Sequence, residues 1–130
     1  MAQIYTCGLM LYSISVISTV LLSQVPSLAV HPGGNVLLPC SFLPGSGGGY
    51  LSWYRLGPNE SVPLCILSLY GDGKTEAVYR NGFTQDHIKL HKNNSKCEII
   101  KVDLSDSGLY FCGKMEEYVK FDSATLVKVQ

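Results

Sequence analysis

The feature that most constrains the fold of this chain is a set of four residues at fixed offsets. Trp53 follows Cys40 by 13 residues, and Cys112 follows Trp53 by 59 residues. Tyr110 lies two residues before Cys112, within the run Asp-Ser-Gly-Leu-Tyr-Phe-Cys at residues 106–112. Three residue types agree at these offsets, so the pattern is compatible with few folds. The segments between these four residues indicate which of those folds the chain adopts.

The apolar segments after the N-terminal region are short and recur at intervals of roughly 8–12 residues, separated by turn residues, which is typical of an all-β protein. Val36, Leu38 and Cys40 alternate with their neighbours, as expected for a strand with one buried face. The glycine-rich residues 44–49 indicate a loop, and residues 71–73 a hairpin. We therefore predict two antiparallel sheets packed face to face, with strands at residues 36–42, 51–55, 62–70, 76–80, 87–91, 97–102, 108–114 and 124–129.

The N-terminal part of the chain carries no Lys, Arg, Asp or Glu before Arg55. Residues 8–22 are almost all apolar or small, and this length is closer to the hydrophobic region of a secretory signal than to a membrane span. We predict a signal peptide over residues 1–23, with a second candidate cleavage site at Ser27, although no Lys or Arg precedes the apolar stretch. A first β-strand and a membrane anchor are the alternatives. The remaining residues 24–130 form one domain.

Cleavage there would remove Cys7 and leave four cysteines, Cys40, Cys65, Cys97 and Cys112. An even number of cysteines behind a secretion signal predicts disulfide bonds formed in an oxidising compartment, and four cysteines allow three connectivities. Two Asn-x-Ser sequons, at Asn59 and Asn93, lie in polar turns and are candidate glycosylation sites.

The pattern of cysteines, tryptophan and tyrosine resembles that of the immunoglobulin superfamily over residues 24–130. More narrowly, Cys65-Ile66 and residues 102–113 resemble the V-set domains of fish immune-type receptors, a group that includes novel immune-type receptors and relatives of the polymeric immunoglobulin receptor. The resemblance implies an immunoglobulin-like V-type β-sandwich in which a disulfide between Cys40 and Cys112 joins the two sheets.

The same resemblance implies roles for several other residues. Trp53 is expected to pack on the bridge, and the Tyr110 hydroxyl to bond to backbone near Asp106. Asp106 is expected to pair with a basic residue, for which His87 is the first candidate and Arg80 the second. A link through His87 would weaken as the pH rises through the range in which histidine titrates, and an exposed, unpartnered His87 is the alternative.

Once Cys40 and Cys112 are paired, Cys65 and Cys97 remain. They lie on strands of opposite sheets near one edge, so they are expected either to form a second bridge or to stay as two buried thiols.

The sequence departs from family patterns in two respects. Residues 123–130 lack the Phe-Gly-x-Gly joining motif of antigen-receptor domains, which argues against a rearranging antibody or T-cell receptor chain. No second apolar span occurs before Gln130. Attachment to a membrane would therefore need a downstream segment, and an ectodomain fragment and a secreted product both remain open.

Strand alternation predicts that Tyr54, Leu56 and Phe111 form one exposed apolar patch on the front sheet, a candidate interface for a homodimer or a ligand. The alternatives are ordinary surface apolarity and a patch covered by the loop after Phe111. Three loops, at residues 43–49, 70–75 and 114–121, are expected to gather at one end of the sandwich. The third carries the candidate contact residues Met115, Glu117 and Tyr118, with Tyr118 as the aromatic anchor.

Composition and motifs exclude other functions. Ten basic and ten acidic side chains balance, which argues against nucleic-acid binding and against a polybasic membrane-surface segment. His31, His87 and His91 are scattered, and no catalytic motif or metal-binding cysteine spacing occurs, so we expect no enzyme activity, metal or cofactor.

We therefore predict the ectodomain of a cell-surface immune receptor that recognises a protein or glycan ligand through its front sheet and end loops. It would pass through the secretory pathway to the extracellular side of the plasma membrane. The alternatives are a homophilic adhesion domain that dimerises through the front sheet and a secreted soluble binding protein.

Overall fold

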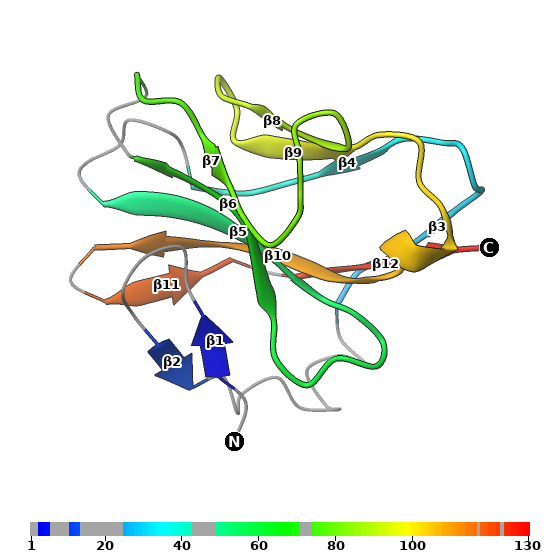
Figure 1. Ribbon diagram of the computed structural model, residues 1–130, viewed down its shortest axis with the longest axis horizontal. Coiled ribbons are helices and arrows are strands. Elements are labelled where there is room, and N and C mark those ends of the chain that lie inside the picture. Colours follow the sequence, from blue (N-terminus) through cyan, green and yellow to red (C-terminus); the bar gives the residue numbers. More distant parts are fainter. Residues whose placement is uncertain are drawn as a thin grey trace.

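The chain folds into two β-sheets that pack face to face (Figure 1). The computed structural model describes residues 3–5, 11–13, 25–42, 49–70, 74–116, 118–122 and 124–130. The described strands are β1 (Gln3–Tyr5), β2 (Leu11–Ser13), β3 (Ser27–Val30), β4 (Val36–Leu38), β5 (Tyr50–Leu56), β6 (Leu64–Tyr70), β7 (Val78–Tyr79), β8 (Ile88–His91), β9 (Lys96–Ile99), β10 (Gly108–Met115), β11 (Val119–Phe121) and β12 (Thr125–Val129). One 3-10 helix, Leu104–Asp106, precedes β10.

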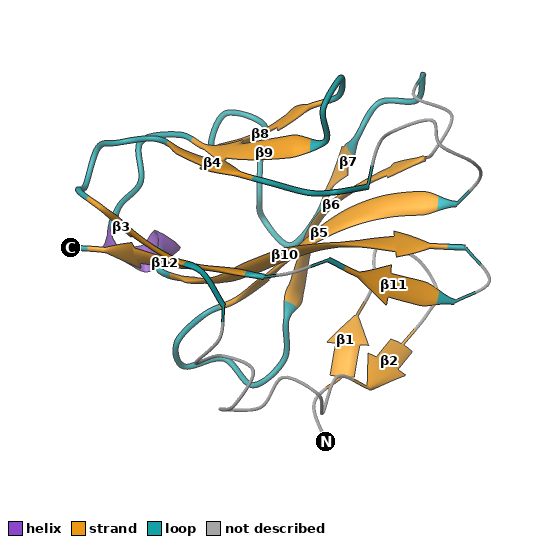
Figure 2. Cartoon of the chain, turned by 180° about the vertical axis from the view of Figure 1, so that it is seen from behind, coloured by secondary structure: helices purple, strands orange, loops and turns teal. Residues whose placement is uncertain are grey.

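The first sheet has the strand order β2-β1-β6-β5-β10-β12-β3, with β7 beside β6 and β11 beside β10. The second sheet has the order β4-β9-β8 and lies above the first in both views (Figure 1 and Figure 2). Most neighbours are antiparallel, whereas β12 with β3 and β1 with β6 are parallel. This confirms the predicted all-β sandwich of two sheets.

Several strands differ in length from the sequence prediction. The strand predicted at residues 36–42 ends at Leu38, because Pro39 has no backbone N–H to continue the ladder. The strand predicted at residues 76–80 is reduced to β7, and residues 114–121, predicted as a loop, contain β11. The sequence reasoning also placed no strand at Ser27–Val30, which forms β3 at the edge of the first sheet.

The core between the sheets is built around Trp53 and a disulfide. Cys40 and Cys112 are bonded at an S–S distance of 2.08 Å, with their Cα atoms 6.0 Å apart, so the bridge joins the end of β4 to β10. Trp53 is 1% exposed and belongs to the same buried cluster as both cysteines. The other members of the cluster are Val36, Leu38, Leu51, Ile66, Leu67, Ile88, Cys97, Ile99, Val102, Tyr110, Val127 and Val129.

The predicted bridge between Cys65 and Cys97 is wrong, because Cys97 is a free, buried thiol. A register shift between Trp53 and Tyr54 places Cys65 opposite Tyr54, while Leu67 lies opposite Trp53. Directly paired residues share a face, so Cys65 lies on the outer face of the first sheet. Cys97 lies in the core between the sheets, and the backbone of the first sheet separates the two residues.

Cys97 therefore acts as a small apolar core residue on β9, paired across the second sheet with Leu38 and Leu90. Burial raises the pKa of the Cys97 thiol, because the thiolate would be formed in an apolar surrounding.

The two N-terminal strands lie within the segment predicted as a signal peptide. β1 and β2 pair antiparallel over three residue pairs, and β1 meets β6 at one pair, Tyr5 with Leu64. In both views they lie on the side of β10 and β11 that faces away from the second sheet (Figure 1 and Figure 2). Removal of residues 1–23 stays a prediction.

Candidate functional site

The outer face of the first sheet, which we call the front face, is apolar at its centre. The strand register aligns Leu56, Leu109 and Leu126 as one row across β5, β10 and β12. Tyr54 and Phe111 form the neighbouring row on β5 and β10. These two rows carry no charged side chain, and an uncharged sheet face turned away from the core is a candidate interface.

The aromatic row of the front face is nevertheless buried in the intact chain. Tyr54 is 2% exposed and Phe111 is 4% exposed, so the prediction that both are exposed is wrong for this chain, whereas Leu56 is half-buried. Their rings stack at 5.4 Å between centroids, and the Phe121 ring meets them edge-on at 6.0 and 5.6 Å. The segment after Phe111 thus folds back over the patch.

A glycine on β10 makes room for this arrangement. A Cβ atom added to Gly113 would lie 2.9 Å from Cδ1 of Phe121, closer than two carbon atoms approach without a clash. The absence of a side chain at position 113 therefore lets Phe121 close over the front face. The low exposed fractions of Tyr54 and Phe111 hold for the intact chain, which contains β1 and β2. These two strands lie on the same side of β10 and β11 as the front face (Figure 1).

A second cluster of side chains, which we call the loop-end row, is exposed at the end of the front face. Tyr50 and Tyr70 lie opposite each other on β5 and β6 and are 43% and 42% exposed. Their rings meet edge-to-face at 5.2 Å between centroids. The row continues through Met115 on β10 to Val119 on β11, both half-buried. It therefore presents aromatic and apolar side chains across four strands.

Tyr118 extends the loop-end row. It is 60% exposed, and Nζ of Lys120 lies 5.3 Å from the centre of its ring. Glu117, the third candidate contact residue of this loop, lies outside the described residues. Sequence reasoning missed Tyr50 and Tyr70. The signal that could have found them is their position at the start and the end of two consecutive antiparallel strands.

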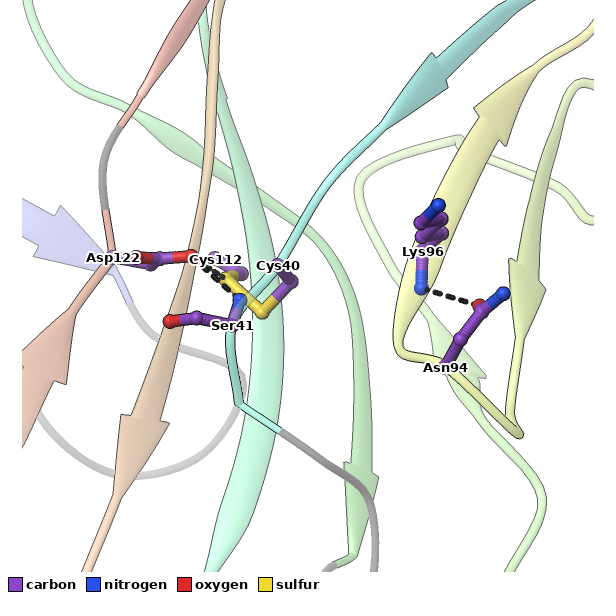
Figure 3. The surroundings of a disulfide bond; sticks show 6 residues. All are labelled: Cys40, Ser41, Asn94, Lys96, Cys112 and Asp122. Atoms are coloured by element: carbon purple, nitrogen blue, oxygen red, sulfur yellow. Dashed lines mark hydrogen bonds between the residues drawn. A yellow bond between two sulfur atoms is a disulfide. The ribbon is translucent and has the colours of Figure 1, made fainter.

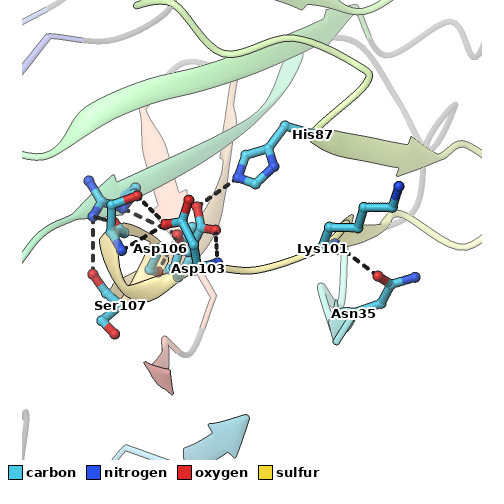
Figure 4. A network of polar contacts seen from close by, with 9 residues as sticks. Asn35, His87, Lys101, Asp103, Asp106 and Ser107 are labelled. Atoms are coloured by element: carbon cyan, nitrogen blue, oxygen red, sulfur yellow. Dashed lines mark hydrogen bonds and ion pairs between the residues drawn. The ribbon is translucent and has the colours of Figure 1, made fainter. Parts of the chain in front are cut away.

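The other end of β10 is held by a polar network (Figure 4). His87 Nε2 lies 2.7 Å from Oδ1 of Asp106, so the partner of this aspartate is His87 rather than Arg80. Oδ2 of Asp106 accepts from the backbone N–H of Asp103 at 2.9 Å. The Tyr110 hydroxyl donates to the backbone carbonyl of Asp106 at 2.7 Å, and this bond fixes the turn before β10.

The Tyr110 hydroxyl gives this network a measurable pH response. Burial raises the pKa of Tyr110 to about 12, against the opposing effect of the Arg55 charge. An unfolded tyrosine titrates near ~10, so above that pH the unfolded chain releases a proton that the folded chain retains. We expect the stability contribution of Tyr110 to be complete below about pH 10 and to be lost as the pH rises towards about 12.

The measurement is the free energy of unfolding, by urea denaturation, of the parent and of Tyr110→Phe from pH 8 to pH 12. Phenylalanine does not titrate, so the difference between the two proteins is expected to shrink across the alkaline range. A constant difference throughout that range would contradict the assignment of this titration to Tyr110.

Asp122 lies beside the disulfide and joins the two sheets at the loop end (Figure 3). Its Oδ2 accepts from the backbone N–H of Ser41 at 2.7 Å and lies 3.8 Å from Sγ of Cys112. Its own backbone N–H donates to the carbonyl of Cys112 at 3.0 Å. The carboxylate therefore ties the segment after β4 to the segment between β11 and β12.

Cys40, Cys112 and Asp122 form the one group of three metal-type ligands among the described residues. Because the two sulfur atoms are bonded to each other, this group is a disulfide with a neighbouring carboxylate. The sequon residues Asn59 and Asn93 are both exposed, in the turn after β5 and in the β8–β9 hairpin. No helix in the described part of the chain is long and apolar enough to cross a membrane.

The two packed sheets, the bridge between them and the tyrosine hydroxyl bonded to the preceding turn define an immunoglobulin-like sandwich of V type. The family model of the immunoglobulin V-set domain matches residues 24–130. The chain therefore belongs to the immunoglobulin V-set family.

Solved structures of immune receptors are similar to this chain. The extracellular fragment of novel immune-type receptor 11 from Ictalurus punctatus is 26% identical with a TM-score of 0.65, over 81% of this chain and 97% of that one. A marsupial T cell receptor is 25% identical with a TM-score of 0.67, over 82% of this chain and 50% of that one. The swine CD8αα homodimer, at 21% identity and a TM-score of 0.68, covers 82% of this chain and 95% of its own and supports the fold alone.

Proposed function

We propose that this chain is the ligand-binding ectodomain of a cell-surface immune receptor and that the loop-end row contacts a protein ligand. The observation that carries the proposal is the exposure of Tyr50, Tyr70 and Tyr118 at one end of the sandwich. The similarity to the extracellular fragment of a novel immune-type receptor supports a receptor role. No catalytic or metal chemistry is part of this function.

The chemistry of the loop-end row favours a protein as the ligand. Tyrosines supply large contact areas with few rotatable bonds, and they are enriched among the residues that dominate protein–protein binding energy. Met115 lies in the same row, and Lys114 and Glu116 form an ion pair of 3.2 Å beside it. A mixed apolar and charged surface of this kind matches the anatomy of a protein interface, with an apolar centre and a polar rim.

The test uses tetramers of the purified protein applied to a panel of intact cells. Tyr50→Ser, Tyr70→Ser and Tyr118→Ser are each expected to weaken staining of a positive cell type by about tenfold or more, as expected for anchors of an interface. Leu104→Ser is the matched control, because Leu104 is 69% exposed in the 3-10 helix and lies outside this row. Its staining is expected to equal that of the parent.

Treating the cells distinguishes the ligand classes. Protease treatment of the cells is expected to abolish staining by the parent, since the ligand is a protein. Staining that survives protease but is lost after removal of cell-surface glycans would contradict a protein ligand. Equal loss of staining for Leu104→Ser and the tyrosine variants would contradict the loop-end row as the site.

A second candidate function is homophilic pairing through the front face, favoured by the row of Leu56, Leu109 and Leu126. A groove of about 520 Å³, lined by these leucines with Pro58 and Val129, continues this face towards the end of β12. Residues 1–23, which contain β1 and β2 on this side of β10 and β11, are predicted to be removed on secretion.

Sedimentation of the protein recovered from secreting cells tests this second function, with its N-terminus determined by mass spectrometry. Self-association at micromolar concentration, abolished by Leu126→Arg at a half-buried position of this row, is the expected behaviour of a pairing domain. A protein that begins at residue 24 and stays monomeric at high micromolar concentration would exclude homophilic pairing.

A further inference from the structure

The charges of this neutral chain are unevenly distributed over its surface. Residues 87–101, which contain β8, β9 and the turn between them, carry four lysines and two histidines but only one carboxylate, that of Glu98. The chain as a whole balances ten basic against ten acidic side chains. The second sheet therefore carries an excess of positive charge that the rest of the chain compensates.

Strand alternation places these charged side chains on the outer face of the second sheet. Ile88, Ile99 and Cys97 are buried in the core, so their neighbours on β8 and β9 point away from the first sheet. The register places Lys89 opposite Glu98 and His91 opposite Lys96. We call this outward surface, with the adjacent residues Asn35, Leu37 and Lys101, the basic face.

The one carboxylate of the basic face is already engaged. Oε1 of Glu98 lies 3.1 Å from Nε2 of His91, and its Oε2 accepts from Nδ2 of Asn35 at 3.3 Å. Asn35 also accepts from the backbone N–H of Lys101 at 2.9 Å (Figure 4), so its side chain bridges Glu98 and the Lys101 backbone. The Glu98 carboxylate therefore interacts with His91 and Asn35, which both belong to the basic face.

Three lysines of the basic face remain without an ion pair among the described residues: Lys89, Lys96 and Lys101. The fourth, Lys92, pairs with Glu76 at 3.2 Å. Lys96 and Lys101 lie on either side of Glu98 along the chain, with Lys96 at the start of β9 and Lys101 two residues after its end. The unpaired charges thus extend along β8 and β9 and into the segment after β9.

We propose that the basic face binds a sulfated polysaccharide chain. A line of cations on an open sheet surface fits an extended polyanion better than a small ligand, which would need a pocket. Lysine ammonium groups act as point charges, and the described face lacks the arginine fork that recognises a carboxylate in bidentate fashion. Leu37, which is 49% exposed beside Glu98, offers an apolar contact for a sugar ring.

The composition of the face also argues against single-stranded nucleic acid, the other extended polyanion. Such ligands are bound by combining cations with aromatic side chains on which the bases stack. The outward residues Leu37, Lys89, Lys96 and Glu98 include no Phe, Tyr or Trp. Because the basic face and the front face belong to different sheets, the polysaccharide and the proposed protein ligand would bind independently.

The test measures binding of the purified protein to immobilised heparin at increasing salt concentration. The variant Lys89→Gln/Lys96→Gln/Lys101→Gln is expected to bind at least about tenfold more weakly, with a shallower dependence of affinity on salt, because fewer counterions are released. The matched control Arg80→Gln/Lys120→Gln/Lys128→Gln removes the same charge from the first-sheet side and is expected to bind like the parent. Circular dichroism establishes that both variants keep the parent fold.

Three outcomes would overturn the proposal. The first is elution of the parent protein from heparin below physiological salt concentration, and the second is an equal loss of affinity in the two triple variants. The third is that a single-stranded DNA of matched charge competes as well as heparin does. Competition by heparin that disappears when the competitor is desulfated is the result that supports a sulfated polysaccharide.

Discussion

Replacing both bridge cysteines, in the variant Cys40→Ala/Cys112→Ala, is expected to lower the free energy of unfolding by about 4 kcal/mol. The bridge closes a loop with a sequence separation of 72, so its loss returns a large chain entropy to the unfolded state. Because stabilities of single domains are about 5–15 kcal/mol, a domain at the low end of this range would keep only about 1 kcal/mol without the bridge, and a substantial fraction of the variant is then expected to unfold near body temperature. Urea denaturation of the oxidised parent and of the double variant measures the difference.

Cys97→Ala is the matched control for this experiment. It removes a buried thiol that takes part in no disulfide, so the expected cost is only about 1 kcal/mol, typical of losing a small buried group. Mass mapping of the native protein should find residues 40 and 112 linked, with Cys97 alkylated only after unfolding. A double variant as stable as the parent, or rapid alkylation of Cys97 in the folded protein, would contradict the assigned roles of these cysteines.

The spacing of Cys40, Trp53, Tyr110 and Cys112 along the sequence predicted the core of this fold, because each offset corresponds to a contact in the structure. Trp53 and Cys112 share a fixed register on β5 and β10, directly opposite each other. Tyr110, two residues before Cys112, points to the same side of β10 and reaches the turn at Asp106 with its hydroxyl. Contacts of this kind depend on strand alternation, which a sequence reveals.

Other features depend on irregularities that alternation does not reveal. The register shift beside Tyr54 moves Cys65 to the outer face, so the bridge to Cys97, which was one alternative for the two remaining cysteines, does not form. Phe121 covers Tyr54 and Phe111 because Gly113 leaves space for its ring. Both outcomes come from long-range packing between strands, and the sequence alone offers no measure of it.

The loop-end row illustrates how a site can be spread beyond the loops that usually suggest it. Sequence reasoning selected Tyr118 from its loop. Tyr50 stood between a predicted loop and a predicted strand, and Tyr70 stood where a predicted strand meets a predicted loop, so neither was proposed as a contact residue. They become neighbours because β5 and β6 are antiparallel, which places the start of one beside the end of the other. A search for exposed aromatic residues at both ends of each predicted hairpin would have found them.

Arg55→Ala is expected to lower the free energy of unfolding by about 3 kcal/mol, because it removes one charge from several acceptors in a partly buried network. The Arg55 guanidinium donates to Oε1 of Glu60 at 3.0 Å and to the Tyr110 hydroxyl at 3.2 Å. It also donates to the backbone carbonyls of Ser105 at 2.6 Å and Ser107 at 3.0 Å. Only 15% of its side chain is exposed, so water cannot replace all of these bonds.

Arg55→Lys separates charge from geometry. Lysine keeps the charge beside Glu60 but cannot donate in four directions from a planar group, so most of the loss, about 2 kcal/mol, is expected to remain. Urea denaturation of the parent, both Arg55 variants and Glu60→Gln measures the effect. Since the network fixes the turn before β10, amide hydrogen exchange at Ser107 and Gly108 is expected to rise in Arg55→Ala. If Arg55→Lys is as stable as the parent, the guanidinium acts only as a charge and the network does not hold this turn.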